Sequence, residues 1–177
     1  MKTSTFGLAL IVVLAAVLPC RAETLDDDSI KKLYADTKAA IHDPDKTREL
    51  METRLDENFT SRSNMTRSMA GTPPQTATET KSKSQAIEAE IGGLKEVNLE
   101  SYDNAVVSIK YAPDRKSAIV NDTSTATGTV NAPSQPGQAA AIIRYTAKES
   151  CSNTLALVDA QIKIMQSDCN DQIVFKN

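Results

Sequence analysis

Aromatic side chains and basic clusters are scarce in this sequence. It contains no Trp, three Phe and four Tyr, so aromatic residues make up 4% of its 177 residues. A core built from this chain must be mainly aliphatic, and few rings are available to stack on nucleic-acid bases. Lys and Arg number 20 against 23 Asp and Glu, which gives a formal net charge of -3 without any basic run. Nucleic-acid binding is therefore disfavoured.

Catalytic and metal-binding motifs are also absent. His42 is the single histidine, so a two-histidine metal site is excluded and any Ser-His-Asp triad would have to use this residue. The sequence contains no GxSxG, CxxC, HExxH, P-loop or dinucleotide-binding GxGxxG pattern. The one acidic cluster, Glu23 with Asp26, Asp27 and Asp28, stands where a helix is about to begin and is interpreted as a solvated first turn. The sequence thus predicts no catalytic residue by motif, no metal and no cofactor.

Residues 1–22 have the parts of a signal peptide. Lys2 supplies the positive start, residues 8–18 are apolar and uncharged, and Pro19 ends this run shortly before the expected cleavage site. A retained anchor is the first alternative, but the run has about eleven residues where a spanning helix needs about 20. A lipoprotein using Cys20 is the second, although Pro19 departs from the small residue usual there. We expect a periplasmic or secreted protein without stable membrane insertion after cleavage.

Two cysteines, Cys151 and Cys169, remain once the leader is removed, an even number that suits an oxidising compartment. The odd positions over residues 141–147 carry Ala, Ile, Tyr and Ala, the pattern of a strand with one buried face. If the next strand follows a three-residue loop at residues 159–161, Cys151 lies directly opposite Cys169. We therefore predict a cross-strand disulfide. Its role is interpreted as structural, because redox-active pairs lie at the start of a helix.

The N-terminal half of the mature chain is expected to hold three helices. Apolar residues recur at helical spacing after Ser29, the expected N-cap of the first helix. Asp43-Pro44 is typical of an N-cap followed by the first helical residue, and it predicts a second helix. A third helix is expected over about residues 84–93, capped by Ser84.

A long loop is predicted around residues 60–83. The segment is rich in Ser and Thr and contains Pro73-Pro74, a pair that fits inside neither a helix nor a strand. Its early part, residues 60–69, could hold a short edge strand, but the alternation there is weak. Such a loop would act as a flap over a pocket or as a docking segment for a partner.

Long strands are expected after residue 96. Apolar and polar residues alternate over 97–101, 105–111, 118–130 and 139–157. Asp103-Asn104 is predicted as a turn, Pro113 opens a second turn, and residues 131–137 form a loop. Residues 23–177 are therefore expected to fold as a single α+β domain.

This order of elements resembles the NTF2-like superfamily, the SnoaL-like and ketosteroid-isomerase-like cone. The resemblance covers essentially all of residues 23–177, including the turn at Asp159-Ala160-Gln161-Ile162. It implies an α+β fold in which N-terminal helices are packed in a strongly curved, mostly antiparallel sheet that leaves a pocket at its open end. It also implies that a homodimer could form through the outer face of the sheet.

The resemblance does not carry one function, because this fold hosts isomerases, dehydratases, cyclases, immunity proteins and non-catalytic modules. An isomerase-like mechanism would need a carboxylate base and a hydrogen-bond donor in an apolar pocket. Candidate donors by residue type are Tyr34, Tyr102, Tyr111 and Tyr145, and candidate bases are Asp103 and Asp122. Tyr34, Tyr111 and Tyr145 are the candidate ligand-pocket residues, whereas Asp103 and Asp122 are interpreted as turn and strand-surface residues.

Two functional hypotheses follow. The first is an exported, non-catalytic binding or protein-interaction module, supported by the missing catalytic motifs, the disulfide and the long loop. The second is a small-molecule-binding protein or an isomerase- or dehydratase-like enzyme that uses the pocket. The expected partner is correspondingly either an unidentified protein or a small apolar ligand.

Overall fold

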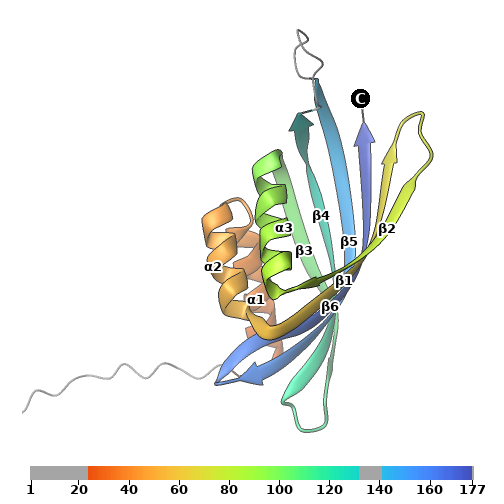
Figure 1. The fold of residues 1–177 in the computed structure, drawn as a ribbon. Helices are drawn as coiled ribbons and strands as arrows, with labels where there is room; N and C mark the ends of the chain where they lie inside the picture. Colours follow the sequence, from red (N-terminus) through yellow and green to blue (C-terminus); the bar gives the residue numbers. More distant parts are fainter. Residues whose placement is uncertain (1–23, 132–140, 177) are drawn as a thin grey trace, which may run out of the picture.

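A curved sheet with three helices on one side makes up the described part of the chain (Figure 1). The computed structural model describes residues 24–131 and 141–176, so the predicted leader and most of the predicted loop at 131–137 lie outside the described residues. The elements are α1 (Asp27–Ala40), α2 (Pro44–Arg54), β1 (Leu55–Met69), β2 (Gln75–Ser82), α3 (Lys83–Glu96), β3 (Val97–Tyr111), β4 (Ser117–Asn131), β5 (Ile142–Val158) and β6 (Gln161–Lys176). Within these ranges no helix is both long and apolar enough to cross a membrane.

The sheet is mixed, and its strand order is β2-β1-β6-β5-β4-β3. The pair β1 and β6 is parallel, and every other neighbouring pair is antiparallel. The sheet curls around the helices without closing (Figure 1). The predicted α+β architecture, with N-terminal helices held in a curved and mostly antiparallel sheet, is confirmed.

Capping residues set where the first two helices begin. Asp26, not Ser29, caps α1: its Oδ1 accepts a hydrogen bond from the backbone N of Ser29 at 2.8 Å. The predicted cap was wrong because α1 begins two residues before Ser29, where the Asp26 carboxylate accepts from the free backbone N–H of the first turn. In α2 the prediction is confirmed, since Asp43 caps the helix and Pro44 occupies its first turn.

The predicted long loop at 60–83 was wrong, because most of this segment forms a hairpin. β1 and β2 pair from Thr60 with Ser82 to Arg67 with Gln75, and Pro73-Pro74 lie in the connection. β1 is also held by β6, more than a hundred residues away in sequence. Neither face of β2 is buried, so no apolar alternation marks it, while backbone pairing and many β-branched threonines still favour a strand. α3 follows directly, and its start lies before the predicted cap at Ser84, because Ser82 N donates to Gln85 Oε1 at 3.0 Å.

The predicted turn at Asp103-Asn104 was also wrong. β3 runs unbroken from Val97 to Tyr111 and pairs along its length with β4. Two register shifts, between Leu99 and Ser101 and between Val106 and Ser108, bend this edge strand without ending it. The pairing with β4 outweighs the local turn preference of an Asp-Asn pair. The turn after Pro113 is confirmed, with Arg115 at a φ of 55°.

The β5–β6 hairpin places the two cysteines together, although its turn differs from the prediction. The turn has two central residues, Asp159 and Ala160, with φ of 49° and 60°, as a type I′ hairpin turn requires. A bulge between Thr154 and Leu155 offsets the missing loop residue. Cys151 therefore still pairs with Cys169, and the predicted disulfide is confirmed, with a Cα–Cα distance of 4.2 Å.

Two apolar clusters join the helices to the concave face of the sheet. In the first, Ile30 and Leu33 of α1 pack with Val120, Leu155 and Ile162. In the second, Leu55 and Phe59 of β1 pack with Ile87 and Ile91 of α3. Burial of each such side chain contributes about 1.5–3 kcal/mol. Ile164 of β6 packs against both clusters, and the space between them is the candidate site.

Candidate functional site

A cavity of about 260 Å³ lies between the helices and the concave face of the sheet. Its walls come from α1, α2, α3 and all strands except β2. Most of the lining is apolar, including Leu33, Ile41, Leu50, Met51, Phe59 and Ile164. A cavity left open and apolar in this way can hold a small organic molecule.

A buried polar cluster forms one part of the cavity wall. Tyr34 Oη on α1 donates to Asp122 Oδ2 on β4 at 2.7 Å, and Asn153 Nδ2 on β5 donates to the same oxygen at 2.5 Å and to Tyr34 Oη at 3.0 Å. Ser167 on β6 donates to the amide oxygen of Asn153. Asp122 and Asn153 each keep only 7% of their surface exposed. Because buried polar groups cost stability unless they are paired, this closed set of hydrogen bonds fixes the cluster.

Burial controls the protonation of this cluster. It raises the pKa of Asp122, an effect that the hydrogen bonds from Tyr34 and Asn153 partly oppose. Burial, followed by the negative charge of Asp122, also raises the pKa of Tyr34 above its usual value. Tyr34 therefore keeps its proton, and that proton is already donated to Asp122.

Three further carboxyl groups meet at the side of the cavity nearest α3. Glu149 of β5 and Glu90 of α3 line both this cavity and a second one of about 310 Å³, and Asp171 of β6 lines the second. Burial, then the charges of Asp171 and Glu90, raise the pKa of Glu149 to about 7. Glu90 is exposed to the cavities that it lines, yet protein surrounds it closely enough that burial raises its pKa as well.

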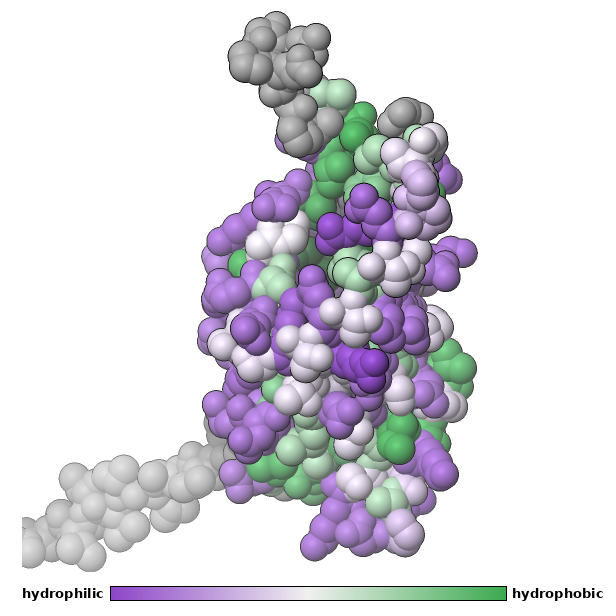
Figure 2. Space-filling view, turned by 45° about the vertical axis from the view of Figure 1, so that its right-hand side comes forward, coloured by the Kyte–Doolittle hydropathy of each residue, from purple (hydrophilic) through white to green (hydrophobic). Residues whose placement is uncertain are grey.

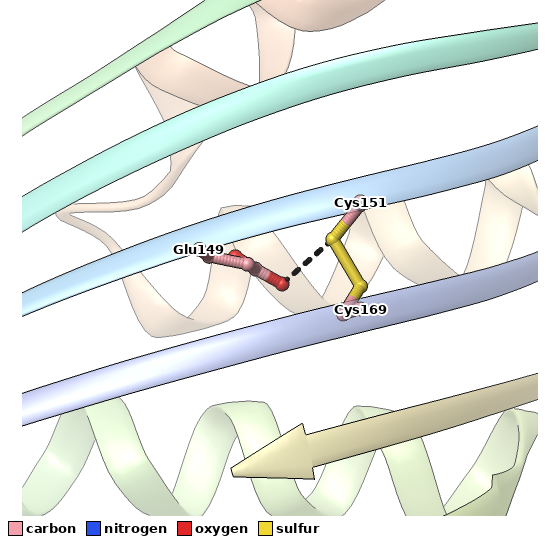
Figure 3. Close-up of side chains that lie close together, drawn as sticks. All are labelled: Glu149, Cys151 and Cys169. Carbon is pink, nitrogen blue, oxygen red and sulfur yellow. Dashed lines mark hydrogen bonds between the residues drawn. A yellow bond between two sulfur atoms is a disulfide. The ribbon is translucent and has the colours of Figure 1, made fainter. Parts of the chain in front are cut away.

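The disulfide also belongs to the cavity wall. Both Cys151 and Cys169 line the cavity, and Glu149 Oε1 lies 3.0 Å from Cys151 Sγ (Figure 3). Within residues 24–131 and 141–176 these three side chains are the one grouping of His, Cys, Asp and Glu donors close enough to hold a metal ion. Because the sulfurs are bonded to each other they offer no thiolate ligand, so the arrangement does not fit a metal.

The tyrosines proposed from sequence lie in different places. Tyr34 lines the first cavity, Tyr145 lines the second, and Tyr102 lines both. Tyr111 lies outside both: its hydroxyl donates to Asp27 Oδ1 at 2.5 Å, and the Arg115 guanidinium lies 5.1 Å from its ring centre.

The two aspartates considered as bases from the sequence, Asp103 and Asp122, also lie in different places. Asp103 is exposed and accepts from Lys38 Nζ at 2.6 Å, away from the cavities. Asp122, interpreted from sequence as a strand-surface residue, is buried in the cavity wall, so that interpretation was wrong. Its even number in β4 places it on the same face as the fully buried Val120, and this parity was the available signal.

Sequence reasoning did not single out Glu149, Asn153 or Glu90. Glu149 and Asn153 share the parity of Tyr145 and Leu155 on β5, whose side chains are buried. The alternation therefore could have placed both on the concave face. Nothing local marks Glu90, because its role depends on how α3 lies over the sheet.

No family model matches this chain, and no curated protein matches it. Solved structures do. A protein from Cytophaga hutchinsonii described as NTF2-like has a TM-score of 0.51 at 17% identity, covering 81% of this chain and 95% of its own. A conserved protein from Planctomyces limnophilus has a TM-score of 0.51 at 10% identity, covering 85% and 98%. A protein from Novosphingobium aromaticivorans, named provisionally as a scytalone dehydratase, has a TM-score of 0.50 at 14% identity, covering 80% of each chain. At such identities the likeness shows the fold alone, and this fold is the one expected from the sequence.

Proposed function

Because this chain has the NTF2-like fold and keeps a cavity open inside it, we propose that it is an exported, non-catalytic protein that binds a small, mainly apolar molecule. The observation that supports this most strongly is the lining of the cavity. Apolar side chains from helices and sheet surround the space, and the polar cluster around Asp122 already satisfies its own hydrogen bonds.

The cavity also indicates the chemistry of its ligand. At about 260 Å³ it is close to the lower end of typical ligand sites. Leu50, Met51 and Phe59 offer apolar contact, whereas Glu149 offers carboxyl oxygens beside the disulfide. A compact apolar molecule that carries one hydrogen-bond donor, such as a hydroxyl group, fits this combination.

An isomerase- or dehydratase-like enzyme is the second candidate, and one observation favours it. Asp122 is a carboxyl group of raised pKa in a cavity wall, as a general base is in many active sites. Against this, Asp122 and Tyr34 are hydrogen-bonded to each other, so neither the base nor the donor is directed at a ligand. We therefore favour binding without catalysis.

A protein-interaction role receives less support than the sequence suggested. The expected docking loop at residues 60–83 is a paired hairpin. The face shown in Figure 2 is mainly hydrophilic, with hydrophobic side chains in separate small areas. Exposed apolar side chains scattered in this way are usual on protein surfaces.

A filled-cavity variant tests the proposed binding. Leu50→Trp places a large ring where a half-buried cavity-lining side chain stands, and Glu49→Trp adds the same ring at the exposed neighbouring position. Both proteins are screened by thermal shift against small hydroxylated apolar compounds. A compound present at 100 times its Kd should stabilise the wild type and Glu49→Trp by about 2.7 kcal/mol, and Leu50→Trp far less. Equal stabilisation of all three proteins would place binding outside the cavity and contradict the proposal.

A second variant separates binding from catalysis. Asp122→Asn keeps the size and the hydrogen-bond positions of the side chain but removes the carboxylate. A binding protein should retain affinity for its ligand within a few-fold. If the wild type converts the ligand chemically, and Asp122→Asn binds the ligand without converting it, the protein is an enzyme and the proposal of binding without catalysis is wrong.

A further inference from the structure

The disulfide is open to the ligand cavity and is not sealed within an apolar cluster. Cys151 and Cys169 both line the cavity, and neither belongs to the two apolar clusters. Cys151 is 8% exposed, and Cys169 is more exposed than this. A small molecule in the cavity can therefore contact the sulfur atoms, and Cys169 is the more accessible one.

The contact between Glu149 and Cys151 is a hydrogen bond when the carboxyl group carries a proton. Glu149 Oε1 lies 3.0 Å from Cys151 Sγ (Figure 3). A sulfur in a disulfide carries no hydrogen, so a hydrogen bond across this contact forms only with protonated Glu149 as the donor and the weakly accepting sulfur as the acceptor. The other oxygen, Oε2, accepts from Ser124 Oγ at 3.1 Å, which orients the carboxyl group toward the disulfide.

The surroundings of Glu149 favour its protonated form. Asp171 faces it from β6, Glu90 from α3, Asp122 from β4 and Tyr102 from β3. Each of these groups is either negative or neutral, so none stabilises a carboxylate by charge. Burial is the largest effect and acts in the same direction, so the pKa of Glu149 rises to about 7 although the hydrogen bond from Ser124 opposes the rise.

We propose that this part of the cavity wall is a thiol–disulfide exchange site for small thiols, in which Cys169 is attacked and Glu149 protonates the departing Cys151 sulfur. The thiolate of the small thiol forms a bond to Cys169 Sγ, and the Cys151–Cys169 bond breaks. The electron pair of that bond goes to Cys151 Sγ, which takes the proton of Glu149. The products are a mixed disulfide on Cys169, a thiol on Cys151 and the carboxylate of Glu149, so the small thiol is oxidised as Cys151 is reduced.

This exchange has a distinctive pH dependence. The attacking group must be a thiolate, and the thiolate becomes more abundant as pH rises. Glu149 must carry a proton, and it loses this proton as pH rises through about 7. Ionised Glu149 also repels both the incoming and the departing thiolate. Replacement by Gln removes the proton donor and the charge together. The ratio of the wild-type rate to the Glu149→Gln rate should therefore fall as pH rises.

The test uses the oxidised mature protein with 2-mercaptoethanol as the thiol. Acid-quenched samples are analysed by intact mass and by peptide mapping. We expect an adduct of one thiol molecule located on Cys169, formed at a rate proportional to thiol concentration. Below pH 7 the wild type should react about tenfold faster than Glu149→Gln, a modest contribution for a positioned acid, and above pH 8 this advantage should disappear.

Two variants serve as controls. Asp168→Asn changes an exposed carboxylate beside Cys169 in sequence but on the opposite face of β6, and it should keep the wild-type pH profile. Leu50→Trp, which narrows the cavity, should slow the exchange. A rate independent of thiol concentration would show that the disulfide reacts only after unfolding and would overturn the proposal. An adduct on Cys151, or a wild-type to Glu149→Gln ratio that is constant with pH, would overturn the assigned roles.

Discussion

Replacing Glu149 by Gln should stabilise the folded protein at alkaline pH and leave it unchanged at acid pH. Gln has the size of a protonated Glu, can accept the hydrogen bond from Ser124, and can donate toward the disulfide. The variant therefore imitates the protonated form and removes only the ionisation. Its effect on stability isolates the free-energy difference caused by burying the carboxylate of Glu149.

The size of this effect follows from the two pKa values. The carboxyl group has a pKa of 4.5 when unperturbed and about 7 in the folded protein, so the folded state binds the proton more tightly. Stability from Glu149 is thus complete below pH 4.5 and is lost as pH rises through about 7. At about 1.36 kcal/mol per pH unit, the span corresponds to at most about 3 kcal/mol. Because Glu149 borders a cavity, we expect Glu149→Gln to be about 1–3 kcal/mol more stable than the wild type near pH 8.

Urea unfolding with the disulfide intact, followed by circular dichroism across pH, measures this difference. The matched control is Asp168→Asn, which removes an exposed carboxylate on the same hairpin and should show no comparable pH-dependent gain. If Glu149→Gln were equally stable or less stable than the wild type near pH 8, the disulfide and the surrounding acidic groups would not raise the pKa of Glu149 as described.

Other predictions concern the frame around the site. Gly128→Ala should destabilise the protein by about 1–3 kcal/mol or more in urea unfolding, because its Cβ would lie 2.2 Å from the backbone oxygen of Asn98; an unchanged midpoint would contradict the β3–β4 packing. Gly92 lies inside α3, and a Cβ added there has no atom within 4 Å other than those of the helix itself. Gly92→Ala should therefore raise the free energy of unfolding by about 0.5–1 kcal/mol, and a lower value would be evidence against this helix. Replacing Cys151 and Cys169 together by Ala should cost about 3 kcal/mol, given their separation of 18 residues, and a smaller loss than 1 kcal/mol would indicate that the bridge adds little to the hairpin.

Local sequence signals predicted the helices and the antiparallel strands where each signal was complete within a few residues. Asp43-Pro44 marked the start of α2 because capping and proline geometry act locally. The pairing of Cys151 with Cys169 was predicted from strand parity, although the loop length was wrong. Two one-residue differences, the shorter turn and the bulge beside Leu155, cancelled.

Pairing with distant strands explains what the sequence did not reveal. The sequences of β1 and β2 show no alternation of apolar and polar residues. β1 is held in place by backbone pairing to β6, which lies at the other end of the chain. Asp103-Asn104 has the composition of a turn but lies within β3, whose partner β4 keeps it extended. Tertiary pairing overrode local preference in both places.

The candidate site was partly visible in the alternation of β4 and β5. Asp122 and Glu149 occupy positions of inward parity, yet charged residues are usually exposed, and this general expectation led Asp122 to be assigned to the surface. Asp122 is buried by its cluster with Tyr34 and Asn153, and Glu149 is half-buried beneath α3, which carries Glu90. Those contacts join elements far apart in sequence.

Native mass spectrometry tests the central proposal most directly. The protein is produced from a gene that encodes residues 1–177 and is purified from a bacterial envelope fraction. We predict a chain that lacks residues 1–22, has two hydrogens fewer than the reduced sequence, and carries the additional mass of a small molecule. The same preparation of Leu50→Trp should lack the added mass, whereas Glu49→Trp should retain it. A small molecule bound equally by Leu50→Trp, or a wild-type protein that stays free of any small molecule and gains none from the compound screen, would contradict ligand binding in the cavity.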